Sequence, residues 1–163
     1  MCGYPNITVG NSLLRKYLSR DIWNELKDKT DPYNFSFREA IFSGIRNTDS
    51  GIGVYAGSHD SYTTFATMFD KIIEDYHGHK INDTHQAENP NVGLNAPDFP
   101  PEEAEMIIST RIRVGRNMAG YPLGPGVSAQ QRAEIESNAT TALSSFDGEL
   151  KGQYYSLASM TDS

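Results

Sequence analysis

The chain has 163 residues, of which 37% are hydrophobic and 21% charged, and its formal net charge is -7. This length fits one ordinary domain, or one small domain and part of another, and the composition is that of a globular protein without a membrane-spanning run. The negative charge argues against binding to nucleic acid or to an anionic membrane, because either partner would repel the chain at long range. The single cysteine, Cys2, precludes an intrachain disulfide and fits a cytoplasmic location.

The first part of the chain predicts short helices with apolar faces. Residues 13–18 place leucine and tyrosine side chains on one side of a first helix, and Ser19 is well placed to cap a second helix over residues 20–28. Ser36 and Glu39 have the spacing of a capping box, in which each side chain accepts a hydrogen bond from the other residue's backbone amide. We therefore expect a third helix to begin after Ser36.

A longer amphipathic helix is expected from about Asp60 to Gly78, since apolar residues recur there with helical spacing and glycine favours the conformation that ends a helix. Its apolar face would consist of Tyr62, Phe65, Ala66, Phe69, Ile72, Ile73 and Tyr76. A face of this kind predicts helical core packing rather than a cofactor site.

The composition changes near residue 82. Residues 82–101 are polar, contain four prolines and lack periodicity, which indicates a linker. The alternation of residues 107–114 then predicts a strand, and a loop rich in glycine and proline follows at 120–126.

The last part of the chain predicts one more helix and one more strand. Ser128 and Gln131 form a second capping box, and residues 152–160 have the composition of a strand. Two strands and one helix are too few to close a sheet and bury both of its faces. The apolar residues of this helix are Ile135, Ala139 and Leu143.

Three arginines lie within six residues of this acidic chain, at positions 111, 113 and 116. Residues two apart along a strand share a face and lie roughly 6.6 Å apart, so Ser109, Arg111 and Arg113 would form one polar row. A hydroxyl and two guanidinium groups suit a polyphosphate, because each guanidinium stays charged and donates a fixed fork of hydrogen bonds. The alternative is an exposed edge strand whose charges prevent aggregation, although lysine would serve there too and the strand has none. The other face would present Ile108, Thr110, Ile112 and Val114 to a core.

Other phosphate-binding and catalytic motifs are absent from the sequence. It has no Walker motif and no nucleophile elbow. Residues 51–56 fit the loose dinucleotide pattern G-x-G-x-x-G/A, but the preceding segment predicts a helix where that motif requires a strand. The small residues therefore favour a tight turn over the alternative, a close approach of the backbone amides to a ligand.

Histidines near the end of the long helix have side chains that can in principle bind a metal. His77, His79 and His85 lie near Asp75 and Asp83, but their spacing matches no zinc signature. A solvated helix end is the simpler interpretation, and we expect no protein metal site.

Two segments resemble the phosphagen kinases, the ATP:guanidino phosphotransferases that include arginine and creatine kinase. Residues 108–123, ISTRIRVGRNMAGYPL, are similar to the signature region of that family. Residues 50–78 are similar to its N-terminal domain, including the loop over the guanidino substrate. The resemblance runs in order from about Leu14 through LKGQYYSLASM, which is far more specific than any single motif.

The resemblance implies roles for two sets of residues. Ser109, Arg111 and Arg113 match the positions that grip the phosphates of ATP, whereas the role of Arg116 stays open. The substrate loop would consist of Ser50, Gly51, Ile52, Gly53, Val54 and Tyr55. Its amides at 51–54 would face the substrate carboxylate, and Tyr55 would add a side-chain contact. The short form of this loop is similar to that of arginine kinases or the related invertebrate taurocyamine kinases, of which we favour arginine kinase.

The resemblance also implies an α+β fold in three parts. We expect a small orthogonal all-helical domain at residues 1–81 and a linker at 82–103. Residues 104–163 would form the opening part of an antiparallel-sheet α+β catalytic domain, with apolar surface left exposed.

The implied reaction is reversible phosphoryl transfer from MgATP to the guanidino group of L-arginine, with ATP, ADP and a guanidino compound as partners. Mg²⁺ would be held mainly by nucleotide oxygens and water. Family members are roughly twice this length, as expected for two domains, and we expect the remainder to hold the catalytic residues. Because phosphoryl transfer depends on positioning all of the groups, we expect these 163 residues alone to be inactive or nearly so. The oligomeric state stays open.

Three alternatives remain at this point. The first is a taurocyamine kinase of the same family. The second is a bacterial protein-arginine kinase, which has a similar arginine strand but lacks the small helical domain expected here. The third is a non-catalytic, truncated binding or interaction module, which a native stop codon after Ser163 would favour and a longer transcript would oppose.

Overall fold

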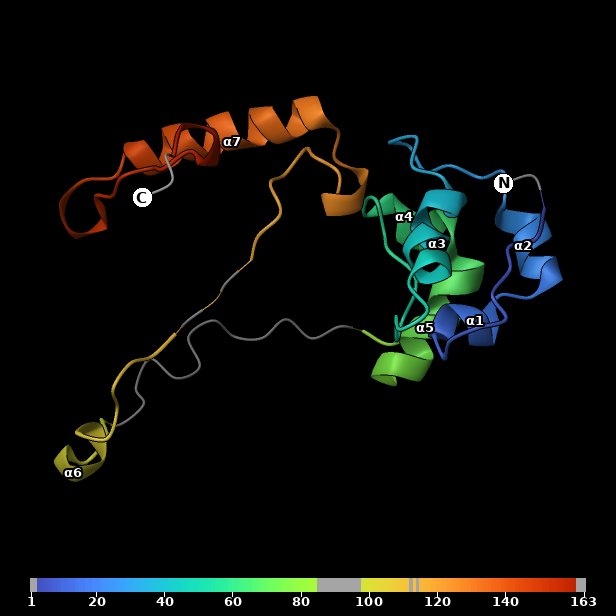
Figure 1. Cartoon of the computed structure of the whole chain (residues 1–163), viewed down its shortest axis with the longest axis horizontal. Coiled ribbons are helices and arrows are strands. Elements are labelled where there is room, and N and C mark those ends of the chain that lie inside the picture. Colours follow the sequence, from blue (N-terminus) through green and yellow to red (C-terminus); the bar gives the residue numbers. More distant parts are fainter. Residues whose placement is uncertain (1–2, 85–97, 112, 114, 161–163) are drawn as a thin grey trace.

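The computed structural model describes residues 3–84, 98–111, 113 and 115–160, and all regular elements of these residues are helical (Figure 1). The α-helices are α1 (Leu13–Tyr17), α2 (Arg20–Leu26), α3 (Phe37–Arg46), α4 (Asp60–Thr64), α5 (Ala66–His77), α6 (Pro101–Ala104) and α7 (Ala129–Ser144). Short 3-10 turns lie at η1 (Gly124–Gly126), η2 (Gly148–Leu150) and η3 (Leu157–Ser159).

Serine caps begin the first three helices. The Ser12 hydroxyl caps α1, and the Ser19 hydroxyl accepts a hydrogen bond of 3.2 Å from the Ile22 amide at the start of α2. At α3 the Glu39 amide donates to the Ser36 hydroxyl at 3.2 Å, and the Ser36 amide donates to the Glu39 carboxylate at 2.8 Å. The caps expected from Ser19 and from the Ser36 capping box are thus confirmed.

The long helix expected from Asp60 is two helices. The backbone leaves the helical conformation at Phe65, with φ -109° and ψ 24°, between α4 and α5. This break accompanies tertiary packing, because the fully buried Phe65 ring lies 5.5 Å from the Phe37 ring and 6.1 Å from the Phe69 ring, between centroids. The stop at Gly78 is confirmed, with a left-handed φ of 66°.

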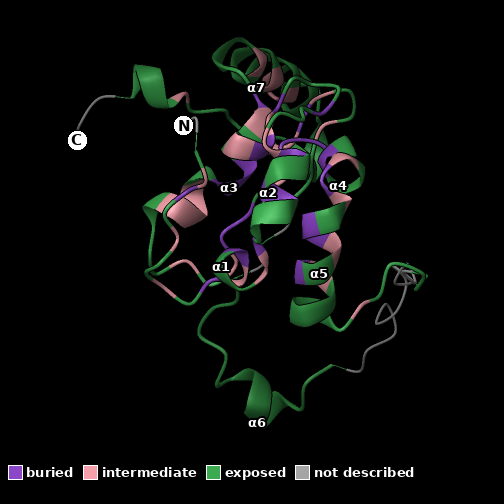
Figure 2. Ribbon diagram, turned by 90° about the vertical axis from the view of Figure 1, so that its right-hand side faces the viewer, coloured by how far each residue is buried: buried purple, intermediate pink, exposed green. Residues whose placement is uncertain are grey.

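An aromatic series runs through the core of the helical body. The Tyr4, Trp23 and Phe37 rings follow one another with centroid separations of 6.3 and 6.4 Å, and Phe65 and Phe69 continue the series. Leucine, isoleucine and methionine side chains fill the space around these rings, and α1 packs against α5. Figure 2 shows the buried residues gathered among α1 to α5. This core holds the loops between the helices in place.

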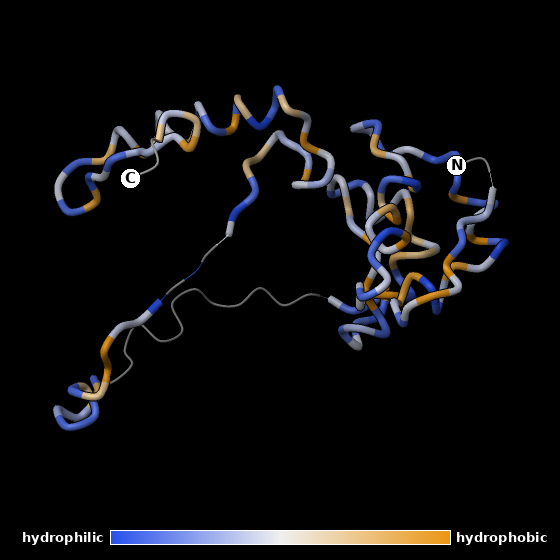
Figure 3. The backbone as a smooth tube through the Cα atoms, in the orientation of Figure 1, coloured by the Kyte–Doolittle hydropathy of each residue, from blue (hydrophilic) through white to orange (hydrophobic). Residues whose placement is uncertain are grey.

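The C-terminal part is built differently. Helix α7 has the expected capping box between Ser128 and Gln131, yet none of its residues is buried. Within the described part of residues 98–160, only Pro122 and Val127 are buried. Figure 3 shows apolar stretches in this part as well as in the helical body. Ile108, Leu150 and Leu157 are among the most exposed of its apolar residues.

The expected α+β fold with the beginning of an antiparallel sheet is wrong for the described residues. They contain no sheet, and their only β-pairing is an isolated antiparallel bridge between Thr30 and Ser36. Residues 107–111 and 152–156, where strands were expected, are irregular, and η3 replaces the end of the second. Alternation indicates which face a residue would take in a sheet, but a strand forms only when its backbone groups pair with a neighbouring strand.

The expected domain limits at 81 and 103 stay predictions. The helices described up to His77 share the core, whereas residues 85–97 of the expected linker lie outside the described residues. No helix in the described part of the chain has the length and apolar character that crossing a membrane requires.

Candidate functional site

Loop 50–55 lies over the start of α1. The amides of Leu13 and Leu14, in the first turn of that helix, donate hydrogen bonds of 2.9 Å each to the carbonyl oxygens of Gly51 and Ile52. At the far end of the loop, the Tyr55 amide donates to the Ala40 carbonyl in α3, also at 2.9 Å. Two helices thereby fix the course of the loop.

Gly53 and Gly44 allow the loop to touch α3 backbone to backbone. Gly53 has a φ of +85°, and a Cβ at Gly44 would overlap the Gly53 carbonyl. A Cβ at Gly53 would lie 2.9 Å from the Leu14 side chain. The small residues of this loop thus permit a close approach between two segments of the protein, which the sequence did not predict.

The amides of loop 50–55 divide into paired and unpaired groups. The Ser50 amide donates to the Asn47 carbonyl at 3.1 Å. The amides of Gly51, Ile52, Gly53 and Val54 donate to no acceptor among the residues that the structure describes. Adjacent amides without protein partners suit an anion such as a carboxylate, because successive backbone N–H groups can donate to it together.

Two cavities flank Tyr55, whose side chain is half exposed. One cavity, of about 400 Å³, is lined by Phe35, Glu39, Phe42, Ser43, Tyr55 and Pro125. The other, of about 280 Å³, runs along α5 and is lined by Ile52, Val54, Tyr55, Ala56, Tyr62, Phe69, Ile72, Ile73, Tyr76 and His77. The loop therefore has open, largely apolar space on both sides.

The arginine segment, residues 107–117, is exposed and irregular where the structure describes it. Ser109, Arg111 and Arg113 all face solvent, while Ile112 and Val114 of the expected core face lie outside the described residues. The expected strand and its polar row are therefore not formed, since no described segment pairs with residues 107–111. No hydrogen bond or cavity among the described residues joins this row to loop 50–55.

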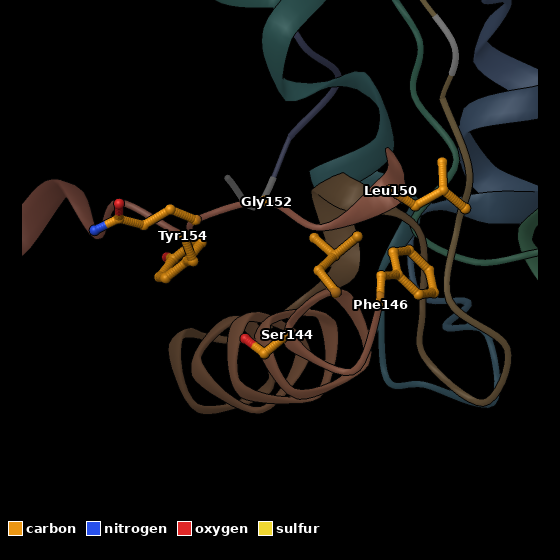
Figure 4. A pocket seen from close by; sticks show the side chains of 7 residues that line it. Ser144, Phe146, Leu150, Gly152 and Tyr154 are labelled. Carbon is orange, nitrogen blue, oxygen red and sulfur yellow. The ribbon is translucent and has the colours of Figure 1, made fainter. Parts of the chain in front are cut away.

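Arg116 faces a cavity of about 300 Å³ at the start of α7. Its guanidinium donates to the Gly115 carbonyl at 2.7 Å. The lining residues are Arg116, Asn117, Met118, Tyr121, Pro122, Gly124, Val127, Arg132 and Ile135. A further cavity of about 170 Å³, shown in Figure 4, lies where the chain turns back at the end of α7. Its lining, with Leu143, Phe146 and Tyr154, carries no charged side chain and does not suit a nucleotide.

The histidine group does not form a metal site in the described residues. Asp75 instead accepts hydrogen bonds from the Lys16 ammonium at 2.8 Å and the Tyr17 hydroxyl at 3.0 Å, which join α1 to α5. These bonds lower the pKa of Asp75, and the Asp75 bond raises the pKa of Lys16. No cluster of three or more potential metal ligands occurs among the residues that the structure describes. His85 lies outside those residues.

Sequence reasoning missed one buried carboxylate, that of Asp31. Burial raises its pKa, but hydrogen bonds from Ser58, Ser61, Phe35 and Tyr33 outweigh burial and hold the pKa below its usual value. The stabilisation is therefore present above the pKa of an unfolded aspartate and is lost as the pH falls through the lowered value in the folded chain. The sequence DPYN does signal a turn, but nothing in it signals contact with serines about 30 residues away.

Comparison with known proteins places the helical body in a family. Residues 8–74 match the family described as "ATP:guanido phosphotransferase, N-terminal domain". Arginine kinase from Schistocerca americana is 45% identical over 152 residues, which cover 92% of this chain and 42% of that protein. Residues 8–74 form a phosphagen kinase N-terminal domain.

Several phosphagen kinases are similar to the chain over nearly all of its length. Arginine kinase 1 from Drosophila melanogaster is 42% identical over 162 residues, or 97% of this chain and 45% of that protein. The taurocyamine kinase of Schistosoma mansoni matches with a TM-score of 0.80 and 26% identity, covering 96% of this chain and 22% of that one. A lombricine kinase structure gives a TM-score of 0.76, with 25% identity over 98% of this chain and 43% of that one. The chain thus spans less than half the length of these phosphagen kinases.

Proposed function

We propose that the chain is the N-terminal part of a phosphagen kinase that transfers a phosphoryl group reversibly between MgATP and L-arginine. The observation that carries the proposal is the 42–45% identity with arginine kinases over 92–97% of the chain, which spans both loop 50–55 and the arginine segment. The reaction forms a P–N bond to the guanidino group and breaks the bond between the γ-phosphorus and the bridging oxygen. Phosphoarginine, MgADP and a proton result.

Loop 50–55 is the proposed site for the acidic end of the guanidino substrate. The support is the run of amides at Gly51, Ile52, Gly53 and Val54 that have no acceptor among the described residues. Tyr55 borders open space on both sides of the loop, so its ring can contact the rest of the substrate. The hydrogen bonds to α1 and α3 hold these groups in place before the substrate binds, which reduces the free-energy cost of binding.

Ser109, Arg111 and Arg113 are the proposed phosphate-binding residues. Their side chains are accessible, and guanidinium groups donate well to phosphate oxygens. Mg²⁺ would be carried mainly by the nucleotide, which neutralises part of the phosphate charge. Because the arginine row is not organised by a sheet in this chain, we expect it to bind nucleotide weakly and the chain alone to have little or no kinase activity.

Two other functions have some support. A taurocyamine kinase is favoured by the similarity to the Schistosoma mansoni structure, and titration with L-arginine and taurocyamine distinguishes the two substrates through their carboxylate and sulfonate groups. A non-catalytic binding module is compatible with the exposed apolar side chains after residue 98. The cytoplasmic location stays a prediction.

The proposal is tested by calorimetric titration of the chain with MgADP. We expect binding in the micromolar to millimolar range, lost when Arg111→Ala and Arg113→Ala are combined. The control combines Arg46→Ala and Arg132→Ala, which removes the same charge from α3 and α7. Equal binding by all three chains would refute the phosphate role of the arginine row. No binding by the unaltered chain would show that the row is not a nucleotide site by itself.

A further inference from the structure

Asp31 is a buried carboxylate that accepts four hydrogen bonds. Its side chain lies in the turn before α3, and the residue is 4% exposed. Oδ1 accepts from the backbone amides of Tyr33 and Phe35, both at 3.0 Å. Oδ2 accepts from the hydroxyls of Ser58 at 2.6 Å and Ser61 at 2.7 Å. All four donors are neutral, and Asp31 forms no ion pair with any described residue.

The carboxylate fixes the direction of both serine hydroxyls, because it can only accept hydrogen bonds. The hydroxyls in turn accept from the backbone of residues 57–60. The Gly57 and Ser58 amides each donate to Ser61 Oγ at 3.1 Å, and the Asp60 amide donates to Ser58 Oγ at 3.1 Å. One carboxylate thus determines the backbone course of the turn before α4.

Gly57 is the point at which a distant part of the chain reaches this turn. The Leu123 amide donates to the Gly57 carbonyl at 2.8 Å. A Cβ at Gly126 would overlap that same carbonyl, and a Cβ at Gly57 would overlap the Phe35 ring. Residues 122–127, which we call the docking segment, include Pro122 and Val127, the two buried residues among those described after residue 97. The Gly57 backbone is therefore enclosed between the Phe35 ring and the docking segment.

We propose that Asp31 is a positioning residue that holds Gly57 against Phe35 as the docking point for residues 122–127. Residues 118–121 connect the arginine segment to the docking segment, whose Pro125 lines the same cavity as Tyr55 of loop 50–55. By holding the docking segment in place, Asp31 determines where the end of the arginine segment lies relative to loop 50–55. The importance of this placement for binding rests on the proposed function. The docking of residues 122–127 at Gly57 does not.

The isosteric change Asp31→Asn removes this function in either orientation of the amide. The carboxamide has one acceptor atom, but donors face Asp31 on two sides, the serine hydroxyls on one and the backbone amides of Tyr33 and Phe35 on the other. If the oxygen faces the serines, the NH₂ group meets two N–H donors. If it faces the backbone, the serine hydroxyls lose their common acceptor and the turn at Gly57 is released.

The test is amide hydrogen exchange of the ¹⁵N-labelled chain, with the Leu123 amide as the reporter. We expect Asp31→Asn to raise the Leu123 exchange rate by about tenfold or more, since a charge-assisted network is lost. Ser19→Ala is the control for general destabilisation, because it removes the cap of α2 and leaves the Asp31 contacts intact. Asp60→Asn is the control for lost charge, since Asp60 is exposed in the same turn.

The amides of α2 and α3 report whether the helical body remains folded in each variant. Faster exchange at Leu123 together with protected amides in α2 and α3 supports the proposal. Leu123 exchange that changes no more in Asp31→Asn than in Ser19→Ala overturns it. If Asp31→Asn does not fold, Ser58→Ala takes its place, because it removes only one of the donors to Asp31. The exchange rate of the Leu123 amide is then compared between Ser58→Ala and Ser19→Ala. Nucleotide titration is a separate readout, so loss of docking with unchanged MgADP binding would refute only the functional consequence.

Discussion

At the residue scale, Gly44 and Gly53 determine how closely loop 50–55 approaches α3. Alanine in place of a glycine inside a helix usually stabilises it by about 0.5–1 kcal/mol. At Gly44 we expect the opposite, because the added Cβ would overlap the Gly53 backbone, which cannot rotate away as a side chain can. Gly44→Ala should lower the free energy of unfolding by about 1–3 kcal/mol, the usual cost of overpacking. Urea denaturation, monitored through the fluorescence of Trp23, measures this change in the free energy of unfolding.

Ser43→Ala is the matched control for Gly44→Ala, since it makes a small change at the neighbouring position of α3. Its hydroxyl accepts only an exposed hydrogen bond from the Asn47 amide group at 3.0 Å, so the unfolding free energy should change little. A Gly44→Ala chain as stable as the unaltered one would show that the loop can move away from α3 without cost.

Individual residues differ in how well the sequence predicted them. The pattern at 51–56 favoured a tight turn, whereas the close contact of the Gly53 backbone with Gly44 was not predicted. The partner Gly44 could not be identified, because nothing local ties a glycine in a helix to a loop several residues later. Asp31 was missed for the same reason, since its serine partners are distant in sequence. The roles of Ser109, Arg111 and Arg113 stay predictions.

At the element scale, two capping boxes of the same type begin helices with different surroundings. Helix α3 buries Phe37, Ala40 and Ile41, whereas α7 buries none of its residues. Each serine cap contributes about 1 kcal/mol to its own helix. We expect Ser36→Ala to lower the urea midpoint of Trp23 fluorescence. Ser128→Ala should leave that midpoint unchanged and instead reduce the helical circular dichroism before unfolding, because an isolated helix of this length is marginal in water.

The two serine variants are each other's control, since they delete the same hydroxyl from the same motif. A shift of the fluorescence midpoint in Ser128→Ala as large as that in Ser36→Ala would show that α7 shares the stability of the core. The sequence predicted both caps because a cap is a contact between residues three apart. It did not predict the absence of the sheet, since a strand depends on partners elsewhere in the chain.

At the scale of the whole molecule, the described residues divide by burial into a helical body and a C-terminal part without its own core. The body contains the aromatic series and the only tryptophan, Trp23, which is 3% exposed. The C-terminal part has two buried residues, Pro122 and Val127, and large apolar side chains such as Leu157 are exposed. The helical body should therefore be more stable than the C-terminal part, because the free energy of local unfolding depends on local buried contacts.

We therefore predict that the chain unfolds in two stages. In urea, circular dichroism should begin to fall at lower concentrations than Trp23 fluorescence, because α7 melts while the aromatic core persists. Hydrogen exchange measured by mass spectrometry should locate the first stage in peptides from residues 129–160 and the second in peptides covering α2, α3 and α5. The Asp31→Asn chain serves as the comparison, since loss of the buried hydrogen bonds should lower the midpoint of Trp23 fluorescence and leave the early fall in circular dichroism in place. Transitions that coincide in circular dichroism and in Trp23 fluorescence would contradict this prediction. They would mean that α7 is stabilised by the core, through the docking segment alone.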